Sequence, residues 1–519
     1  MPRAAVAHKP VRFLVNVLWS WTGVAANIFV GLVLTPYLIR KLGKEQYGIW
    51  ALIFAVLDYF WLFDLGLNTA VCNFCARFIA VKDHEKINEV INTSLFYFTM
   101  IGLLVWGIAS FAAREAHRFF PVSAQYLGEF EHLVLITALS WGLCIMLHMF
   151  VSALDGFQRF DLTSRVWVAM LAVRSIGYFL VLKSGHALVA MAGVFVFTQI
   201  LGYVLNFFNF MRVFPALKLS PRYVRRTMFH DILTYGLRSF VANGSTLALS
   251  QSGTVMVAHY LGNVSAGFFA LPSRLLQYAV DAISRVALVT RSKAAELSVA
   301  GSREDNVALG VYANRYSLTL FMPLAVFLLV FGRPLLFRWV PADIASRSAP
   351  LVPVFVLSNA LVLAAQFNSS SLLFGLGRHG RYARALVVEA VLFLAGLVWV
   401  VPRYGILGAA SLSAGLMLAI RGVYTPWLVS RALDCSFFSY MQGIYVRPLL
   451  AGVPVGVLAL LLRSTWLPGR TWPELTLAGC VCGLAYSAIA MVMCLAPAHR
   501  MLLLSRIPVL GPRLVPGRA

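Results

Sequence analysis

The chain has 519 residues, of which 60% are hydrophobic and only 12% are charged. About a quarter of the residues in an average soluble domain are charged, so this composition excludes a water-soluble enzyme and a disordered chain and indicates an integral membrane protein. The net charge of +23 is typical either of a nucleic-acid-binding protein or of a membrane protein with basic loops on one side, and the positions of the charges decide between the two.

Apolar runs long enough to cross a bilayer as helices, at about 20 residues each, follow one another along the whole chain. In order they cover 13–38, 48–71, 95–113, 133–154, 166–182, 187–210, 232–260, 264–290, 316–331, 351–376, 386–401, 406–429, 449–462 and 475–495. None has the apolar–polar alternation of a transmembrane barrel strand. The sequence therefore predicts an all-α integral membrane protein with about 14 transmembrane helices.

The basic residues fall mainly on one side of this arrangement. If the N-terminus is cytoplasmic, the inner segments carry more than twice as many lysines and arginines as the outer segments. That count includes Arg238, Arg285 and Arg421, which lie within spans near their inner ends. The distribution predicts that both termini are cytoplasmic, and it explains the basic excess without a nucleic-acid partner.

A sequence motif recurs in the two halves of the chain. Leu-Gly-x4-Gly, followed by two bulky apolar residues and Ala-Leu, begins at Leu42 and again at Leu261, a constant offset of 219 residues. The equivalent helices are six spans apart, an even number, so both copies have the same orientation in the membrane. Such a parallel repeat predicts a binding site between two six-helix lobes.

The repeat and the loop charges together predict the organisation of the chain. In order, we expect a cytoplasmic N-terminus (1–12), a first six-helix lobe (13–210), a basic cytoplasmic linker (211–231), a second six-helix lobe (232–429), an additional helix pair with its inner loop (430–495) and a basic cytoplasmic tail (496–519), with a central cavity between the lobes. The sequence contains no phosphate-binding loop, zinc-protease motif or serine-hydrolase motif. We therefore expect no catalytic residues, no metal and no cofactor.

Ionisable and polar residues within the spans are the candidate functional residues, because such groups usually face a water-filled cavity. In the eighth span, Arg274, Gln277, Tyr278 and Asp281 share one helical face. The first, second and seventh spans also carry polar stripes, which indicates an aqueous cavity lined by these four helices. Arg174 lies near the middle of the fifth span.

Several of these residues also have a structural interpretation. Arg274 can pair with Asp281 two turns away, and Arg238 can anchor its helix at the inner leaflet. Asp64 can act either as a helix cap or packing residue or in ion coupling. Glu389 can be buried against an arginine of another helix.

The segment from Thr35 to Asn68 carries a more specific pattern. It reads Pro36-Tyr37, then Leu42-Gly43-x3-Tyr47-Gly48, then Asp64-Leu65-Gly66-Leu67. In these motifs, and in the number and orientation of its spans, the chain resembles the polysaccharide-transporter (Wzx-type flippase) branch of the multidrug/oligosaccharidyl-lipid/polysaccharide exporter superfamily. The second copy departs from the first at Ala266, which stands where the first has Tyr47.

The resemblance implies a flippase and not an enzyme. Its substrate would be an undecaprenyl-pyrophosphate-linked oligosaccharide, the repeat unit of an O-antigen, exopolysaccharide or capsule, moved from the inner to the outer leaflet of a bacterial cytoplasmic (inner) membrane by alternating access. The implied partners are this lipid-linked oligosaccharide, membrane lipids, a glycan polymerase and a chain-length regulator.

A pyrophosphate needs cationic partners, and a glycan needs a cavity lined with side chains that form hydrogen bonds. The candidate substrate-binding residues are therefore Arg274, Arg174, Arg238, Gln277, Tyr278, Asn27, Asn243 and Gln251. The candidate ion-coupling residues are Asp58, Asp64, Asp281 and Glu389.

Other functions remain open at this point. A cation-coupled exporter of drugs or small molecules from the same superfamily predicts a cavity dominated by acids, whereas this cavity mixes acids with arginines. A flippase for the peptidoglycan lipid precursor is chemically close to the main prediction. A membrane enzyme of glycan assembly would need an acid–base pair on a sizeable external loop, and the sequence offers none.

Overall fold

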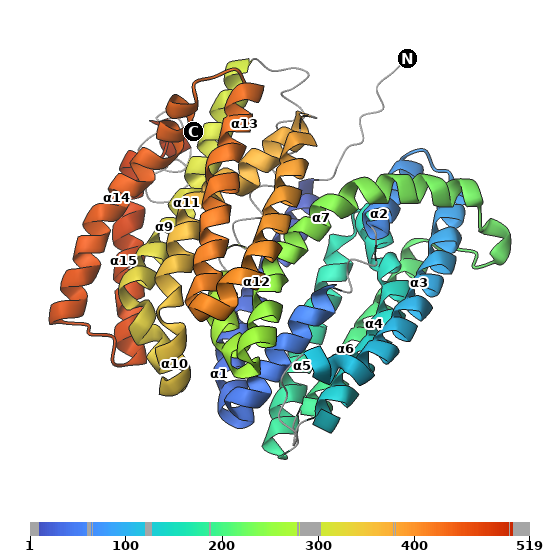
Figure 1. The fold of residues 1–519 in the computed structure, drawn as a ribbon. Helices are drawn as coiled ribbons and strands as arrows, with labels where there is room; N and C mark the ends of the chain where they lie inside the picture. Colours follow the sequence, from blue (N-terminus) through green and yellow to red (C-terminus); the bar gives the residue numbers. More distant parts are fainter. Residues whose placement is uncertain are drawn as a thin grey trace. The chain divides into compact units, whose positions relative to one another are not determined.

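All regular elements in the described part of the chain are helices (Figure 1). The computed structural model describes residues 10–59, 64, 66–119, 127–185, 188–277, 280, 303–376, 378, 380–497 and 499–501. The prediction of an all-α protein is confirmed for these residues.

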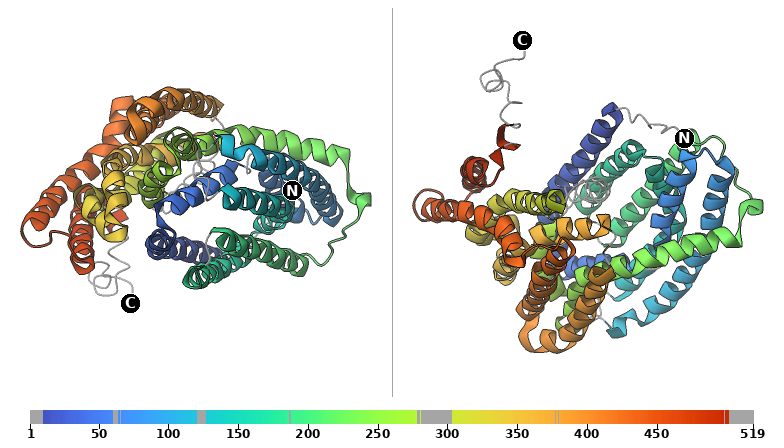
Figure 2. Two further views of the ribbon diagram at one scale, coloured as in Figure 1. Left: turned by 60° about the horizontal axis from the view of Figure 1, so that its bottom comes forward. Right: turned by 90° about the horizontal axis from the view of Figure 1, so that it is seen from above.

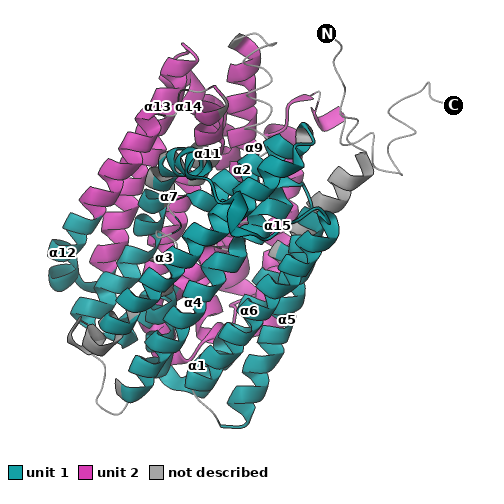
Figure 3. Cartoon of the chain, turned by 90° about the vertical axis from the view of Figure 1, so that its right-hand side faces the viewer, with its two compact units in different colours: residues 1–270, 394–406 teal, residues 271–393, 407–519 magenta. Residues whose placement is uncertain are grey.

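The chain divides into two compact units, shown in two colours in Figure 3. Unit 1 comprises Met1–Ala270 and Leu394–Ile406, and unit 2 comprises Leu271–Phe393 and Leu407–Ala519. The elements of unit 1 are α1 (Pro10–Tyr59), α2 (Leu67–Ala80), α3 (His84–Phe119), α4 (Leu127–Gly156), α5 (Phe160–Lys183), α6 (Leu188–Val213), the 3-10 helix η3 (Pro221–Tyr223) and α7 (Arg226–Leu261). Those of unit 2 are α9 (Arg303–Trp339), α10 (Ala342–Ser348), α11 (Leu351–Gly375), the π-helix η4 (Leu418–Tyr424), α13 (Thr425–Ala432), α14 (Phe437–Thr465) and α15 (Trp472–Met493), while α12 (Gly380–Met417) contributes to both units.

The helices make this a multi-pass membrane protein. Within the described residues, eight helices are long and apolar enough to cross a membrane, or nine if α10 and the first part of α11, bent by 46°, form one span. One of the eight stretches runs over 53 residues, Gly380–Ala432. One straight helix of this length, at 1.5 Å per residue, would extend about 80 Å, against an apolar layer of about 30 Å. This stretch contains two of the predicted spans, and the total of fourteen stays a prediction.

The two long helices are interrupted at glycines in the left-handed region. Gly43 within α1 has φ 75° and ψ 176°, and Gly405 within α12 has φ 62° and ψ −152°. Gly262, the equivalent of Gly43 in the second copy of the motif, has φ 83° and ψ 164° and ends α7. Glycine adopts these dihedral angles without the steric cost of a Cβ. The two copies therefore share a backbone break as well as a sequence.

The two motif copies also meet each other within unit 1. A Cβ on Gly48 would lie 2.1 Å from the carbonyl oxygen of Asn263, closer than any real contact. A Cβ on Gly267, the equivalent of Gly48, would lie 3.4 Å from the Cα of Gly48 itself. Because each equivalent glycine leaves room for the other copy, the motif encodes a close approach of two helices in addition to a turn.

A second pair of glycines extends the repeat to later turns of the chain. Gly185, just after α5, and Gly405 both have positive φ, at 80° and 62°. Each stands two residues after a basic residue, Lys183 and Arg403, and the pair is 220 residues apart. This near-identical offset supports the predicted repeat.

The second predicted span, 48–71, is not one helix. Helix α1 ends at Tyr59 and α2 begins at Leu67 after Gly66, which has φ 74°. A Cβ on Gly66 would lie 2.2 Å from the carbonyl oxygen of Gly236 in α7. The interruption thus coincides with a tight contact between the start of α2 and α7, which an apolar run in the sequence does not reveal.

Each unit has its own apolar core. In unit 1 the core joins α2, α3, α4, α6 and α7 and includes Leu67, Phe98, Phe150, Phe210 and Ile232. In unit 2 it joins α9, α11, α14 and α15 with parts of α12 and α13 and includes Leu318, Leu372, Val429, Tyr440 and Tyr486.

The predicted lobe boundaries differ from those of the two units. Helix α7 packs in unit 1 against α1, α2 and α3, whereas the sequence assigns this span to the second lobe (232–429). The arrangement of two six-helix lobes with an additional pair stays a prediction.

Candidate functional site

Arg174 is a half-buried arginine in the middle of α5. Its Nε donates a hydrogen bond to Thr198 Oγ1 at 2.9 Å, and its Nη2 donates one to Gln199 Oε1 at 2.8 Å, both on α6. Its guanidinium carbon lies 4.7 Å from the centre of the Phe195 ring. Within the described residues, its titratable neighbours are two tyrosines and a cysteine, and no carboxylate pairs with it.

This arrangement fixes a permanent cation among neutral groups. Arginine is not deprotonated in proteins, so α5 and α6 hold a positive charge whose described partners supply only dipoles and a ring face. A guanidinium in such a setting can bind an anion strongly, because its planar set of donors matches the geometry of phosphate and carboxylate.

Asp64 belongs to a hydrogen-bonded chain at the start of α2. Its Oδ1 accepts from the backbone N–H of Asn68 at 3.1 Å and from Asn68 Nδ2 at 2.6 Å. Asn68 Oδ1 in turn accepts from the Ser152 hydroxyl of α4 at 3.0 Å. The carboxylate therefore acts as a cap for α2, which is the structural role that the sequence left open. A role in ion coupling stays a prediction.

Glu389 and Arg421 form a buried ion pair in unit 2. Arg421 Nε donates to Glu389 Oε2 at 2.8 Å, and the two side chains are 11% and 2% exposed. Glu389 lies on α12, and Arg421 lies within the π-helix η4. From the sequence, Arg421 is expected near the inner end of its span. The structure instead buries Arg421 against Glu389, which is the structural alternative that the sequence analysis gives for Glu389.

The remaining candidates differ in exposure, and several lie outside the described residues. Arg274 and Gln277 are exposed on the helix over 263–277, while Asn27 of α1 and Gln251 of α7 are partly buried. The side chains of Asp58, Arg238 and Asn243, and the whole of Tyr278 and Asp281, lie outside the described residues. The described contacts place Arg174, Asp64 and Glu389 in three groups with different partners, so the common cavity stays a prediction.

Sequence reasoning missed a set of polar side chains on α3 that hold the linker after α6. Asn88 donates to the carbonyl of Ala216 at 3.1 Å and accepts from the N–H of Lys218 at 2.7 Å. Asn92, one turn further along α3, donates to the carbonyl of Lys218 at 2.7 Å and accepts from the N–H of Ser220 at 2.8 Å. Two asparagine amides thus satisfy four backbone groups of the linker.

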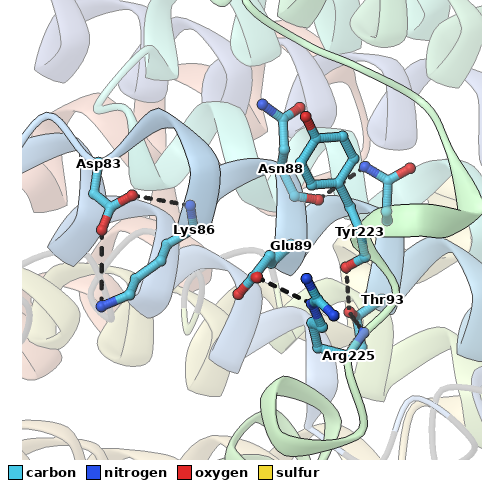
Figure 4. Close-up of polar contacts among 8 residues, drawn as sticks. Asp83, Lys86, Asn88, Glu89, Thr93, Tyr223 and Arg225 are labelled. Carbon is cyan, nitrogen blue, oxygen red and sulfur yellow. Dashed lines mark hydrogen bonds and ion pairs between the residues drawn. The ribbon is translucent and has the colours of Figure 1, made fainter.

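The same face of α3 continues the contact toward α7 (Figure 4). Thr93 Oγ1 accepts from the N–H of Arg225 at 3.0 Å, and Arg225 Nε pairs with Glu89 at 3.3 Å. We call Asn88, Asn92 and Thr93 the linker clamp. The signal was present in the sequence, because Asn88 and Asn92 are four residues apart and so share a helical face, but their backbone partners lie about 130 residues away.

The described part of the chain is thus a multi-pass helical membrane protein with a glycine-marked motif in two copies and ionisable groups inside its apolar helices. The family model described as "Polysaccharide biosynthesis protein" matches residues 13–290, more than half of the chain. The chain belongs to this family.

Individual relatives agree with this assignment. The chain is 22% identical over 511 residues to the uncharacterized membrane protein EpsK of Bacillus subtilis, covering 96% of this chain and 98% of the relative. It is 21% identical over 437 residues to the putative O-antigen transporter of Shigella flexneri, covering 82% and 98%. In structure it is similar to the lipid II flippase MurJ in an inward closed conformation, with a TM-score of 0.70, 16% identity and coverage of 92% and 98%. The predicted membership in the polysaccharide-transporter branch of the exporter superfamily is confirmed.

Proposed function

We propose that this protein is a flippase that moves an undecaprenyl-pyrophosphate-linked oligosaccharide from the inner to the outer leaflet of a bacterial cytoplasmic membrane. The observation that carries the proposal is Arg174, a cation held within the apolar helices by neutral groups. Membership in the polysaccharide biosynthesis family and the names of the relatives, an O-antigen transporter and a lipid II flippase, support this substrate class.

In this proposal the arginines bind the pyrophosphate, with Arg174 as the principal ligand and Arg274 and Arg238 as additional cations. Amide and hydroxyl groups bind the glycan. These are Gln277, Tyr278, Asn27, Asn243 and Gln251. The lipid tail stays in the bilayer, so that only the polar headgroup has to pass through the protein.

Alternating access follows from the predicted architecture of fourteen spans in two six-helix lobes, an additional helix pair and two cytoplasmic termini. Rocking of the lobes would open the cavity to one leaflet and then to the other. An ion gradient can drive transport in one direction if an acid within the spans binds the coupling ion. The candidates are Asp58, Asp64, Asp281 and Glu389.

The proposal is tested in cells that lack the gene, by following which leaflet holds the lipid-linked oligosaccharide. Charge-assisted hydrogen bonds contribute about 1.5–3 kcal/mol each. Arg174→Gln should therefore lower export at least about tenfold at normal protein level, and Arg174→Lys should retain an intermediate rate. Arg403→Gln is the matched control, because Arg403 is exposed and contacts Trp399 of its own helix. Full export by both Arg174→Ala and Arg274→Ala would eliminate the cationic-cavity model.

A cation-coupled exporter of small molecules is the second candidate, because Glu389 is a buried acid on an apolar helix. In cells that lack the gene, a small-molecule exporter predicts the opposite result for glycan export. Glycan export would be unchanged by deletion of the gene, and efflux of cationic drugs would instead depend on Glu389.

A further inference from the structure

Arg315 of α9 and Arg447 of α14 are neighbours in unit 2, because Arg315 bonds to Gly443, which lies one helical turn before Arg447. The predicted apolar spans begin at residues 316 and 449, directly after each of them, and the last predicted span ends at 495, just before His499. Helices α9, α14 and α15 pack against one another (Figure 2). On the predicted spans, the two arginines lie where three adjacent helices leave the apolar layer together, at the depth of lipid headgroups.

The structure holds Arg315 in one orientation. Arg315 is only 7% exposed. Its Nε donates to the carbonyl of Gly443 on α14 at 2.6 Å, and its guanidinium carbon lies 5.2 Å from the centre of the Tyr312 ring. A Cβ on Gly443 would lie 3.0 Å from a methyl carbon of Val311 and 3.9 Å from Arg315 Nη2. The glycine thus allows α14 to approach α9 beside the guanidinium.

Tyr316, the residue after Arg315, contacts His499. The Tyr316 hydroxyl and His499 Nδ1 are 2.7 Å apart, which ties the segment after α15 to α9. The Tyr316 hydroxyl also accepts from the backbone N–H of Ala496 at 3.3 Å, while the Arg447 side chain is exposed.

The charge of this cluster is unbalanced. The titratable groups that face Arg315 within the described residues are Arg447, two tyrosines and a cysteine, without a carboxylate. The acids at the start of α9, Glu304 and Asp305, lie about 15 Å away along the helix. The terminal segment 502–519 contains no aspartate or glutamate. Two like charges near an apolar layer repel each other, and an anion between them would remove this cost.

We propose that Arg315 and Arg447 bind the phosphate of an anionic phospholipid in the leaflet on the predicted cytoplasmic side. Basic pockets between transmembrane helices on this side are suited to acidic headgroups. Val446 and Leu450, within one helical turn of Arg447, are 40% and 54% exposed. They offer an apolar surface to acyl chains, which a free phosphate would not use. This site is independent of the proposed transport function.

The test uses the purified full-length protein in detergent, titrated with phosphatidylglycerol, phosphatidylcholine or inorganic phosphate, with bound lipid counted by native mass spectrometry. Phosphatidylglycerol should bind in preference to phosphatidylcholine. At about 1 kcal/mol for each basic residue, Arg315→Gln and Arg447→Gln should each weaken phosphatidylglycerol binding about fivefold, whereas Arg447→Lys should retain most of it.

Arg463→Gln is the matched control. Arg463 lies at the other end of α14 and donates to the carbonyl of Val330 on α9 at 2.6 Å, so it makes the same kind of helix-to-helix bond as Arg315. If Arg315→Gln does not fold, the test uses only the variants of Arg447, which is exposed. The proposal is overturned if Arg447→Gln binds phosphatidylglycerol like the unaltered protein, if Arg463→Gln loses as much binding, or if phosphatidylcholine or inorganic phosphate competes as well as phosphatidylglycerol.

Discussion

At the scale of single residues, the partners of the charged side chains inside the helices distinguish their roles. Asp64 caps α2, Glu389 is neutralised by Arg421, and Arg174 has only neutral described partners. The contact between Asp64 and Asn68 was predictable, because residues four apart meet on a helix. The partners of Arg174 were not, because they depend on how α5 is rotated against α6, and an apolar helix pair gives no sequence signal of its register.

The buried pair leads to a prediction about stability. Arg421→Ala leaves Glu389 as an uncompensated charge 2% exposed, and breaking one side of such a pair costs about 3–5 kcal/mol. Thermal unfolding in detergent should show a large loss for Arg421→Ala and a much smaller loss for the apolar double variant Glu389→Leu with Arg421→Met. Equal losses in both would show that packing, and not charge, dominates at this position.

At the scale of elements, apolar length identified the helices, while the breaks within them came from glycines whose role is visible only in three dimensions. The motif at Gly48 and Gly267 was recognised as a repeat, but its function as a close contact between the two copies required the structure. Asp64, a candidate cap, and Gly66 were signals of the interruption before α2, but they lie within an otherwise apolar run that reads as one span.

The close contact predicts a contrast between two glycines. Gly48→Ala places a methyl group 2.1 Å from the Asn263 carbonyl oxygen and must push two helices apart, at a cost of about 1–3 kcal/mol. Gly107→Ala, within α3, meets no atom within 4 Å and should be neutral or stabilising by about 0.5–1 kcal/mol. The amount of folded protein after extraction, followed by size-exclusion chromatography, measures both. A Gly48→Ala protein as stable as Gly107→Ala would contradict the contact.

Loss of the linker clamp should expose the linker backbone to solvent. Replacing Asn88 and Asn92 by alanine removes four hydrogen bonds to the linker backbone. Hydrogen exchange of the Lys218 and Ser220 amides should then become about tenfold faster or more. Asn359→Ala is the control, since that side chain donates only to the carbonyl of Phe355 in its own helix. Unchanged exchange in the double variant would mean that the clamp does not hold the linker.

At the scale of the whole molecule, the family and the all-α membrane class followed from composition, spans and the motif at residues 35–68, and these predictions are confirmed. The division into two six-helix lobes stays a prediction. Sequence repeats reveal which helices are equivalent, whereas packing determines which helices contact each other, and α7 packs in unit 1. The glycine pairs at Gly43 and Gly262, and at Gly185 and Gly405, nevertheless support two related halves.

Transport of a lipid-linked oligosaccharide between leaflets is the central claim, and the most direct measurement uses the purified protein in vesicles. A fluorescent undecaprenyl-pyrophosphate oligosaccharide is placed in one leaflet, and a membrane-impermeant quencher reports its arrival in the other. We expect rapid transfer with the unaltered protein, strongly reduced transfer with Arg174→Gln, and normal transfer with Arg403→Gln. Transfer no faster than in protein-free vesicles, with a folded protein and with an ion gradient in either direction, would contradict this claim.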